Sequence, residues 1–226
     1  MAIPYRRIAL TLAGASALSL ACTGCISYTI GQGAETVPVN ERATSSSMNY
    51  VPGTLGDGDQ ETSTRRISVD SDVRFGVDDR TDIGVRINTY TGVMLTWKRQ
   101  LGRPDTSSRP ENRARSALML GSGIVNMGEH GAVEGTLITS GPWTTVGQWY
   151  GGARITQVIP LSRTARHDDP VVGISIGHLF GDRESSIGPE LGLYYDRSTL
   201  GLNSNRILVI PSIVIRKGGL PFLGRR

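Results

Sequence analysis

The stretch ISVDSDVRFGVDDRTDIGVRIN, residues 67–88, alternates apolar and polar side chains on both sides of a short polar break. Positions 73, 75 and 77 are apolar, whereas positions 70, 72 and 74 are charged. A period of two predicts a β-strand whose two faces meet different surroundings. The run DDR at residues 78–80 predicts a tight turn, so the whole stretch is expected to form an antiparallel hairpin.

The same alternation continues along most of the remaining chain, as in GVMLTWKRQL at residues 92–101. Nine such segments separated by turns predict an all-β protein, an antiparallel up-and-down barrel of about eight to ten strands over residues 66–217. Residues 218–226 are expected to form a tail, and one short helix competes around Glu111–Met119. The later strands are expected at Ser116–Asn126, Val133–Ser140, Gln148–Ile159, Val171–Phe180, Ser186–Tyr195 and Arg206–Arg216.

The polar parity of these strands combines small residues with sparse charges of both signs. A soluble sheet usually exposes many long Lys and Glu side chains, whereas a narrow lumen needs side chains that interdigitate and charges that find partners. The pattern therefore favours a membrane barrel whose apolar parity faces lipid. The expected network of lumen charges consists of Asp72, Arg74, Asp82, Arg86, Lys98, Arg154 and Glu190.

Alternation alone is also compatible with the reverse arrangement, in which the apolar parity faces inward. That alternative is a soluble, lipid-anchored periplasmic domain that binds an apolar ligand or a protein in a lipocalin-like manner. Aromatic residues near the segment ends favour the membrane barrel, because interfacial girdles place them there. The aromatic residues in question are Trp97, Trp149, Tyr150, Tyr194 and Tyr195.

Residues 1–24 have the organisation of a signal peptide. Two arginines at positions 6 and 7 precede an uncharged, largely apolar run over residues 8–20. That run is shorter than the roughly 20 residues that a membrane-spanning helix needs. We therefore expect export through this signal.

The two cysteines of the chain follow this apolar run. The sequence TGC at residues 23–25 is similar to the end of a bacterial lipobox, which predicts cleavage before Cys25 and acylation of its sulfur and amino group. Cys22 is the alternative lipid site, and a conventional cleavage elsewhere would instead leave both cysteines free to pair. Residue 26 is isoleucine rather than the aspartate typical of inner-membrane retention. We therefore expect an outer-membrane destination, with acyl chains and outer-membrane lipid as partners.

Residues 25–65 are expected to form the lipidated amino terminus and a polar linker. The run ERATSSSMNYVPGTLGDGDQETSTRR, residues 41–66, is rich in Ser, Thr, Gly, Asp and Glu and has no sustained apolar period. Such a segment buries too little apolar surface to offset the entropy of ordering it. A short strand near Ser27–Gly31 is the only regular structure expected before residue 66.

The run DVRFGVDDRTDIGVRINTYTGVMLTWKRQL, residues 72–101, resembles small bacterial outer-membrane β-barrel proteins, in particular uncharacterised lipoproteins of that kind. The resemblance covers about residues 67–217 and implies an outer-membrane barrel. Two features depart from the pattern. The chain ends in GGLPFLGRR rather than in a strand with a terminal aromatic residue, and a lipobox is uncommon on a barrel.

The sequence offers little catalytic chemistry. The 24 basic and 20 acidic residues are spread along the chain, which argues against a nucleic-acid partner. No nucleophile elbow, phosphate-binding loop or dinucleotide motif occurs, so we expect no cofactor and no enzyme activity.

The three histidines are the remaining candidates for catalytic or metal-binding chemistry. His130 and His167 are expected in loops, and a metal site built on His167, Asp168 and Asp169 is disfavoured because adjacent side chains diverge. The rival hypothesis of a barrel hydrolase uses His178 with Ser185 or Ser186 as nucleophile and Glu190 as acid.

Overall fold

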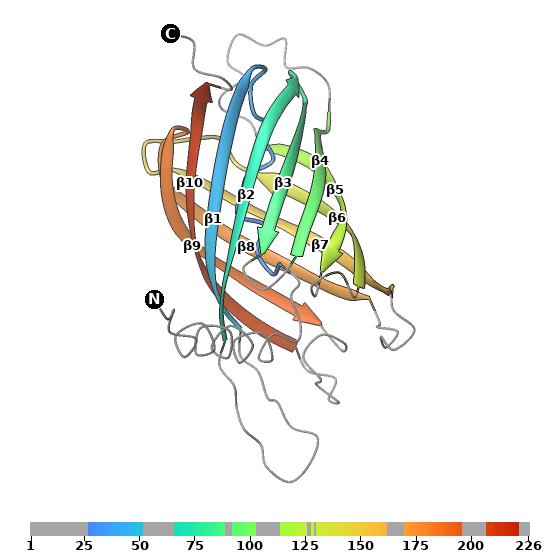
Figure 1. Cartoon of the computed structure of the whole chain (residues 1–226). Coiled ribbons are helices and arrows are strands. Elements are labelled where there is room, and N and C mark those ends of the chain that lie inside the picture. Colours follow the sequence, from blue (N-terminus) through green and yellow to red (C-terminus); the bar gives the residue numbers. More distant parts are fainter. Residues whose placement is uncertain are drawn as a thin grey trace, which may run out of the picture.

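The computed structural model describes residues 27–51, 66–88, 92–102, 114–125, 128, 130–161, 170–195 and 207–221. These residues form a closed barrel of ten antiparallel strands (Figure 1). The predicted all-β, up-and-down barrel is therefore confirmed. The strands are β1 (Glu41–Val51), β2 (Arg66–Asp78), β3 (Thr81–Asn88), β4 (Gly92–Gln100), β5 (Arg115–Val125), β6 (His130–Ser140), β7 (Gln148–Pro160), β8 (Val171–Gly181), β9 (Ser185–Tyr195) and β10 (Ile207–Pro221).

Each strand pairs with its neighbours in the chain, and β1 closes the barrel against β10. The hairpin that the sequence predicts is β2 and β3, joined by the turn at residues 79–80. The competing helix is wrong for residues 115–119, because they pair with both β4 and β6. Within the described ranges, no helix is long and apolar enough to cross a membrane.

Two boundaries differ from the expected domain organisation. Residues 41–51 are not a linker but the strand β1, which pairs with β2 on one side and β10 on the other. Its serines and threonines gave no apolar period, yet pairing on both edges satisfies its backbone without a large apolar contribution. The expected tail also begins later than residue 218, because β10 continues to Pro221.

The segment 27–37, which we call the lumen segment, runs inside the barrel instead of forming a tether. All of its residues except Glu35 and Thr36 are buried. It turns back into β1 at residues 38–40, where the Glu41 N–H donates to the Pro38 carbonyl over 3.0 Å and Asn40 has a φ of 64°. Asn is one of the few residues that adopt this left-handed conformation at low cost.

The lumen segment passes along the full barrel axis. We call the end where β1 begins and β10 ends the upper mouth, and the other end the lower mouth, as oriented in Figure 1. The first bonded residue, Ser27, donates to Asp70 in the lower part of β2. The wall partners then move upward, from Glu190 in the middle of β9 for Ile30 to Asp82 at the top of β3 for Val37.

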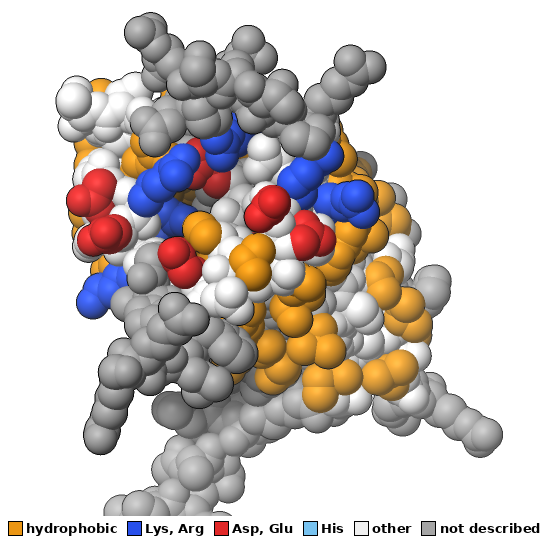
Figure 2. Space-filling view, turned by 90° about the horizontal axis from the view of Figure 1, so that it is seen from above, with side chains coloured by type: hydrophobic (Ala, Val, Ile, Leu, Met, Phe, Trp, Pro, Cys, Tyr) orange, Lys and Arg blue, Asp and Glu red, His pale blue; other side chains and the backbone are white. Residues whose placement is uncertain are grey.

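The two faces of the barrel wall differ sharply in chemistry. The apolar parity points outward, with exposed fractions of 66% for Leu95, 64% for Ile176 and 57% for Ile174. The polar parity points inward, where Asp82 and Lys98 are 0% and 1% exposed. Seen from above, charged side chains gather at the upper mouth and hydrophobic side chains lie along the wall (Figure 2).

β10 is apolar on both faces, a feature that left its orientation open from sequence. Ile207, Val209, Ile213 and Ile215 point outward and are exposed. The inward residues of the strand pack instead on the lumen segment: Leu208 and Ile210 share a cluster with Tyr28, and Val214 shares one with Ile30 and Ala34.

Candidate functional site: the occupied lumen

A continuous chain of ion pairs lines one side of the lumen. Asp82 lies between two cations, with its Oδ1 2.5 Å from Arg74 Nη2 and its Oδ2 3.3 Å from Lys98 Nζ. Asp72 links Arg74, at 3.5 Å, to Arg86, at 3.3 Å. Strand register produces these contacts, because Asp72 stands opposite Arg86 and Asp82 opposite Lys98.

Glu134 on β6 extends this chain to β7. Its Oε1 accepts from Arg86 Nη1 over 3.0 Å, and its Oε2 lies 4.0 Å from Arg154 Nε. Glu134, which the sequence did not indicate, thus adds Arg154 to the chain of ion pairs, and six of the seven predicted lumen charges belong to it. The strand around Glu134 gave no clean signal, because its inward positions mix Glu134 and Thr136 with apolar Ala132 and Ile138.

The seventh predicted charge, Glu190, binds the backbone of the lumen segment. Its carboxylate accepts from the N–H groups of Ile30 over 2.7 Å and Gly31 over 2.9 Å, and from the Tyr150 hydroxyl over 2.7 Å. Asp70, also missed as a network member, accepts from the hydroxyls of Ser27 and Thr29 and from Asn49. Asp70 lies two residues before Asp72 and therefore on the same face of the strand, which is the sequence signal that could have identified it as a lumen residue.

Two cationic side chains of the wall donate hydrogen bonds to carbonyl groups of the lumen segment. Arg154 donates through Nη1 to the Ser27 carbonyl over 2.7 Å and through Nη2 to the Thr29 carbonyl over 2.8 Å. Lys98 donates to the Gln32 side chain over 2.9 Å and to the Glu35 carbonyl over 2.7 Å. The charged side chains of the wall therefore bind both each other and the backbone of the lumen segment.

Two tyrosines expected in the interfacial girdle lie in the lumen instead. Tyr150 and Tyr194 are 0% and 1% exposed, and the girdle expectation is wrong for both. Each ring lies over glycine: a Cβ on Gly177 would overlap the Tyr150 ring, and a Cβ on Gly173 or Gly192 would overlap the Tyr194 ring. Small inward residues therefore make room for large ones on neighbouring strands.

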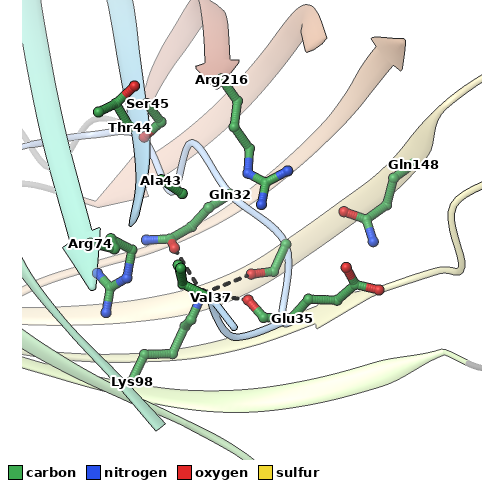
Figure 3. Close-up of a pocket in the computed structure, with 11 residues that line it drawn as sticks. Gln32, Glu35, Val37, Ala43, Thr44, Ser45, Arg74, Lys98, Gln148 and Arg216 are labelled. Atoms are coloured by element: carbon green, nitrogen blue, oxygen red, sulfur yellow. Dashed lines mark hydrogen bonds between the residues drawn. The ribbon is translucent and has the colours of Figure 1, made fainter. Parts of the chain in front are cut away.

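A small cavity with several polar side chains in its lining lies in the upper part of the lumen. Its volume is about 20 Å³, enough for about one water molecule. Glu35 of the lumen segment, Lys98, Gln148 and Arg216 surround it (Figure 3). Glu35 is also held at the upper mouth by Trp143 Nε1, at 3.0 Å, with Arg115 and Arg183 nearby.

The residues of the hydrolase hypothesis are not brought together. His178 lies on the outer parity of β8 and its ring contacts Phe180, whereas Glu190 and Ser186 are buried on the lumen side of β9. Ser185 is exposed at the end of β9, next to the turn that joins it to β8. The barrel wall separates the proposed base from the proposed acid, so this triad is wrong.

Several other candidates lie outside the described residues, namely Cys22, Cys25, His167, Asp168 and Asp169. His130 begins β6, where it pairs with Pro160. Among the residues that the structure describes, no group of three His, Cys, Asp or Glu side chains is arranged to hold a metal ion.

No family model matches the chain, and comparison with curated proteins finds no match. Among solved structures, it is similar to an outer membrane channel of Pseudomonas putida F1, with 8% identity over 81% of this chain and 97% of that one, at a TM-score of 0.49. The outer membrane protein OprG of Pseudomonas aeruginosa has 9% identity over 83% and 97%, at 0.30. The attachment invasion locus protein Ail of Yersinia pestis has 8% identity over 80% and 97%, at 0.26. The barrel is therefore assigned from the strand pairing of this chain itself.

Proposed function

We propose that the protein is an outer-membrane β-barrel of the bacterial cell envelope, anchored by lipid at its amino terminus, without catalysis, and with a structural or small-solute role. One observation carries the proposal: the apolar face of the wall points outward and the charged face points to the barrel axis. This arrangement is the reverse of a soluble barrel and matches the apolar outer band of membrane barrels.

The outer surface of the barrel would be costly to expose to water. Every described strand from β2 to β10 exposes large apolar side chains, including Ile83 on β3, Leu137 on β6 and Ile155 on β7. Full burial of an apolar side chain of this size contributes about 1.5–3 kcal/mol, so side chains that are half exposed to water forgo about half of that each. Soluble monomers rarely expose apolar patches above a few hundred Å². A surrounding bilayer removes this cost.

The lipocalin-like alternative lacks support for the same reason. A lipocalin-like domain needs an empty apolar calyx. Here the lumen contains Asp82, Arg86 and Glu190, all at most 3% exposed, and is filled by the protein's own chain.

The test is membrane fractionation combined with gel mobility. We expect the full chain to fractionate with outer membranes, to require detergent for extraction, and to migrate faster before boiling than after boiling. A chain that stays in the soluble fraction after removal of its amino-terminal 26 residues, with the same mobility before and after boiling, would refute the proposal.

The lipid anchor is tested separately at the two cysteines. Cells grown with an alkyne analogue of palmitate should label the wild-type chain and the Cys22→Ser variant, but not the Cys25→Ser variant. Label that persists in Cys25→Ser and disappears in Cys22→Ser would move the anchor to Cys22. Label in neither the wild type nor the variants would remove the anchor from the proposal.

The absence of catalysis is tested on the outer-wall histidine. Phospholipid acyl composition should be unchanged on overexpression of the wild type and identical to that with the His178→Ala variant. Lysophospholipid that accumulates with the wild type alone would contradict this part.

A further inference from the structure

We propose that the lumen segment is a displaceable gate, and that the barrel conducts ions and small hydrophilic solutes when residues 27–37 leave the lumen. This inference rests on the proposed membrane function and adds a transport activity to it. It is carried by how the segment is bound, by the wall behind it and by the size of the barrel.

Polar groups of the wall bind the backbone of the segment, and its side chains Tyr28, Ile30 and Ala34 also pack in the two apolar clusters of the lumen. Glu190 accepts two of its N–H groups, Asp82 accepts that of Val37 over 3.0 Å, and Ser140 Oγ accepts that of Ala34 over 3.0 Å. Arg154 and Lys98 bind its carbonyl groups. None of residues 27–37 belongs to a strand. Water can replace such bonds one at a time, whereas a wall strand must break a whole ladder.

The wall behind the segment is charged, so water would enter once the segment has left. The buried charged residues of the described wall are five acidic and four basic: Asp70, Asp72, Asp82, Glu134, Glu190, Arg74, Arg86, Lys98 and Arg154. Most of them pair with each other across the strands, and those pairs do not depend on the segment. The near balance of sign predicts weak selectivity between cations and anions.

The width of the barrel sets what passes. About eight strands make an interior that side chains alone fill, and diameter grows with strand number. The two further strands of this barrel make room for one chain, and that chain is the lumen segment. Its departure would open a passage about as wide as one polypeptide, which admits ions and small solutes but excludes folded proteins.

Tyr28 closes the passage at the lower mouth. Its ring is 2% exposed and lies edge-on to Tyr194, with centroids 5.1 Å apart and planes at 75°. It joins an apolar cluster that includes Val51, Met94 and Leu208, contributed by three different strands. An apolar collar of this kind conducts poorly when dry, so Tyr28 is the residue whose truncation should open the barrel most easily.

The first experiment measures conductance across planar lipid bilayers. We expect the wild type to be closed with rare openings, the Tyr28→Ala variant to open more often, and a variant lacking residues 27–37 to conduct continuously. A synthetic peptide SYTIGQGAETVP, the sequence of residues 27–38, should block the deletion variant, and a scrambled peptide should not. Val39→Ala, an exposed position beyond the segment, is the matched control and should behave as wild type.

The second experiment locks the segment in place. The hydroxyls of Thr29 and Ser47 are 2.7 Å apart, so Thr29→Cys with Ser47→Cys places two thiols within disulfide reach, in a background with Cys22 and Cys25 changed to serine. Adding this pair to the Tyr28→Ala variant should abolish its openings under oxidation, and dithiothreitol should restore them.

Gel mobility before boiling separates the outcomes. A deletion or Tyr28→Ala variant that inserts as a heat-modifiable barrel but remains silent overturns the gate and leaves the proposed membrane barrel intact. If the deletion variant fails to assemble, Tyr28→Ala and its disulfide lock decide alone. A wild-type chain that does not insert at all would refute the proposed function and the gate together.

Discussion

Replacement of Glu190 by alanine should lower the free energy of unfolding of the barrel. The side chain is 2% exposed and accepts hydrogen bonds from Ile30, Gly31 and Tyr150. Each buried donor left without an acceptor costs about 1–3 kcal/mol. Water that enters the vacated polar space satisfies part of this demand, so we expect the free energy of unfolding to fall by about 3 kcal/mol rather than by the full sum.

Urea unfolding in lipid vesicles, followed by tryptophan fluorescence, measures this loss. Glu184→Ala is the matched control, since Glu184 is exposed in the turn before β9 and should change stability by less than about 0.5 kcal/mol. Glu190→Gln keeps the shape and one carbonyl oxygen, so it should fall between wild type and Glu190→Ala. If Glu190→Ala unfolds at the same urea concentration as Glu184→Ala, the carboxylate does not hold the lumen segment.

Three further changes test the lumen and the wall. Arg86→Ala leaves Asp72 and Glu134 buried without the guanidinium that pairs with both. This variant should lower the unfolding free energy by about 3–5 kcal/mol in the same assay. Stability equal to that of the wild type would contradict the network. The side chain of Gly173→Val overlaps the Tyr194 ring, so this variant should lower the unfolding free energy by about 1–3 kcal/mol. Gly135→Ala should be neutral, because the nearest atoms to a Cβ at this position lie 3.8 Å away. Equal effects of the two variants would argue against the tyrosine packing. Leu95→Arg, on the outer wall, should cost about 2–4 kcal/mol in vesicles, and a neutral result would argue that lipid does not reach this position.

Much of the barrel was predictable because its signal is periodic. The parity of Asp72 and Arg74 against Val73 and Phe75 identified both the strand and its two faces, and the structure places those faces as expected. The nine predicted segments correspond to strands β2 to β10. Cross-strand pairing was not predictable, because parity tells which face a charge occupies but not which charge stands opposite it.

The lumen segment could not be recognised for a different physical reason. A chain inside a polar barrel is ordered by bonds from its backbone to wall side chains such as Glu190 and Arg154, which leave no apolar period in its own sequence. Composition therefore made residues 27–37 and β1 look like a linker. The one local indication in the sequence was the presence of two apolar residues, Tyr28 and Ile30, because a fully solvated tether needs no apolar side chains. Both residues are buried in the structure.

The lumen segment also changes how the chain is arranged across a bilayer. A barrel with an even number of strands normally has both ends on one side, because each strand reverses the last. Here the chain runs ten times along the wall and once more through the interior, so Ser27 lies toward the lower mouth, whereas β10 ends at the upper mouth. An acyl group on Cys25 would then anchor the protein from the side opposite to the end of β10, and antibodies to a tag placed after Cys25 and to a tag after β10 should label intact cells differently.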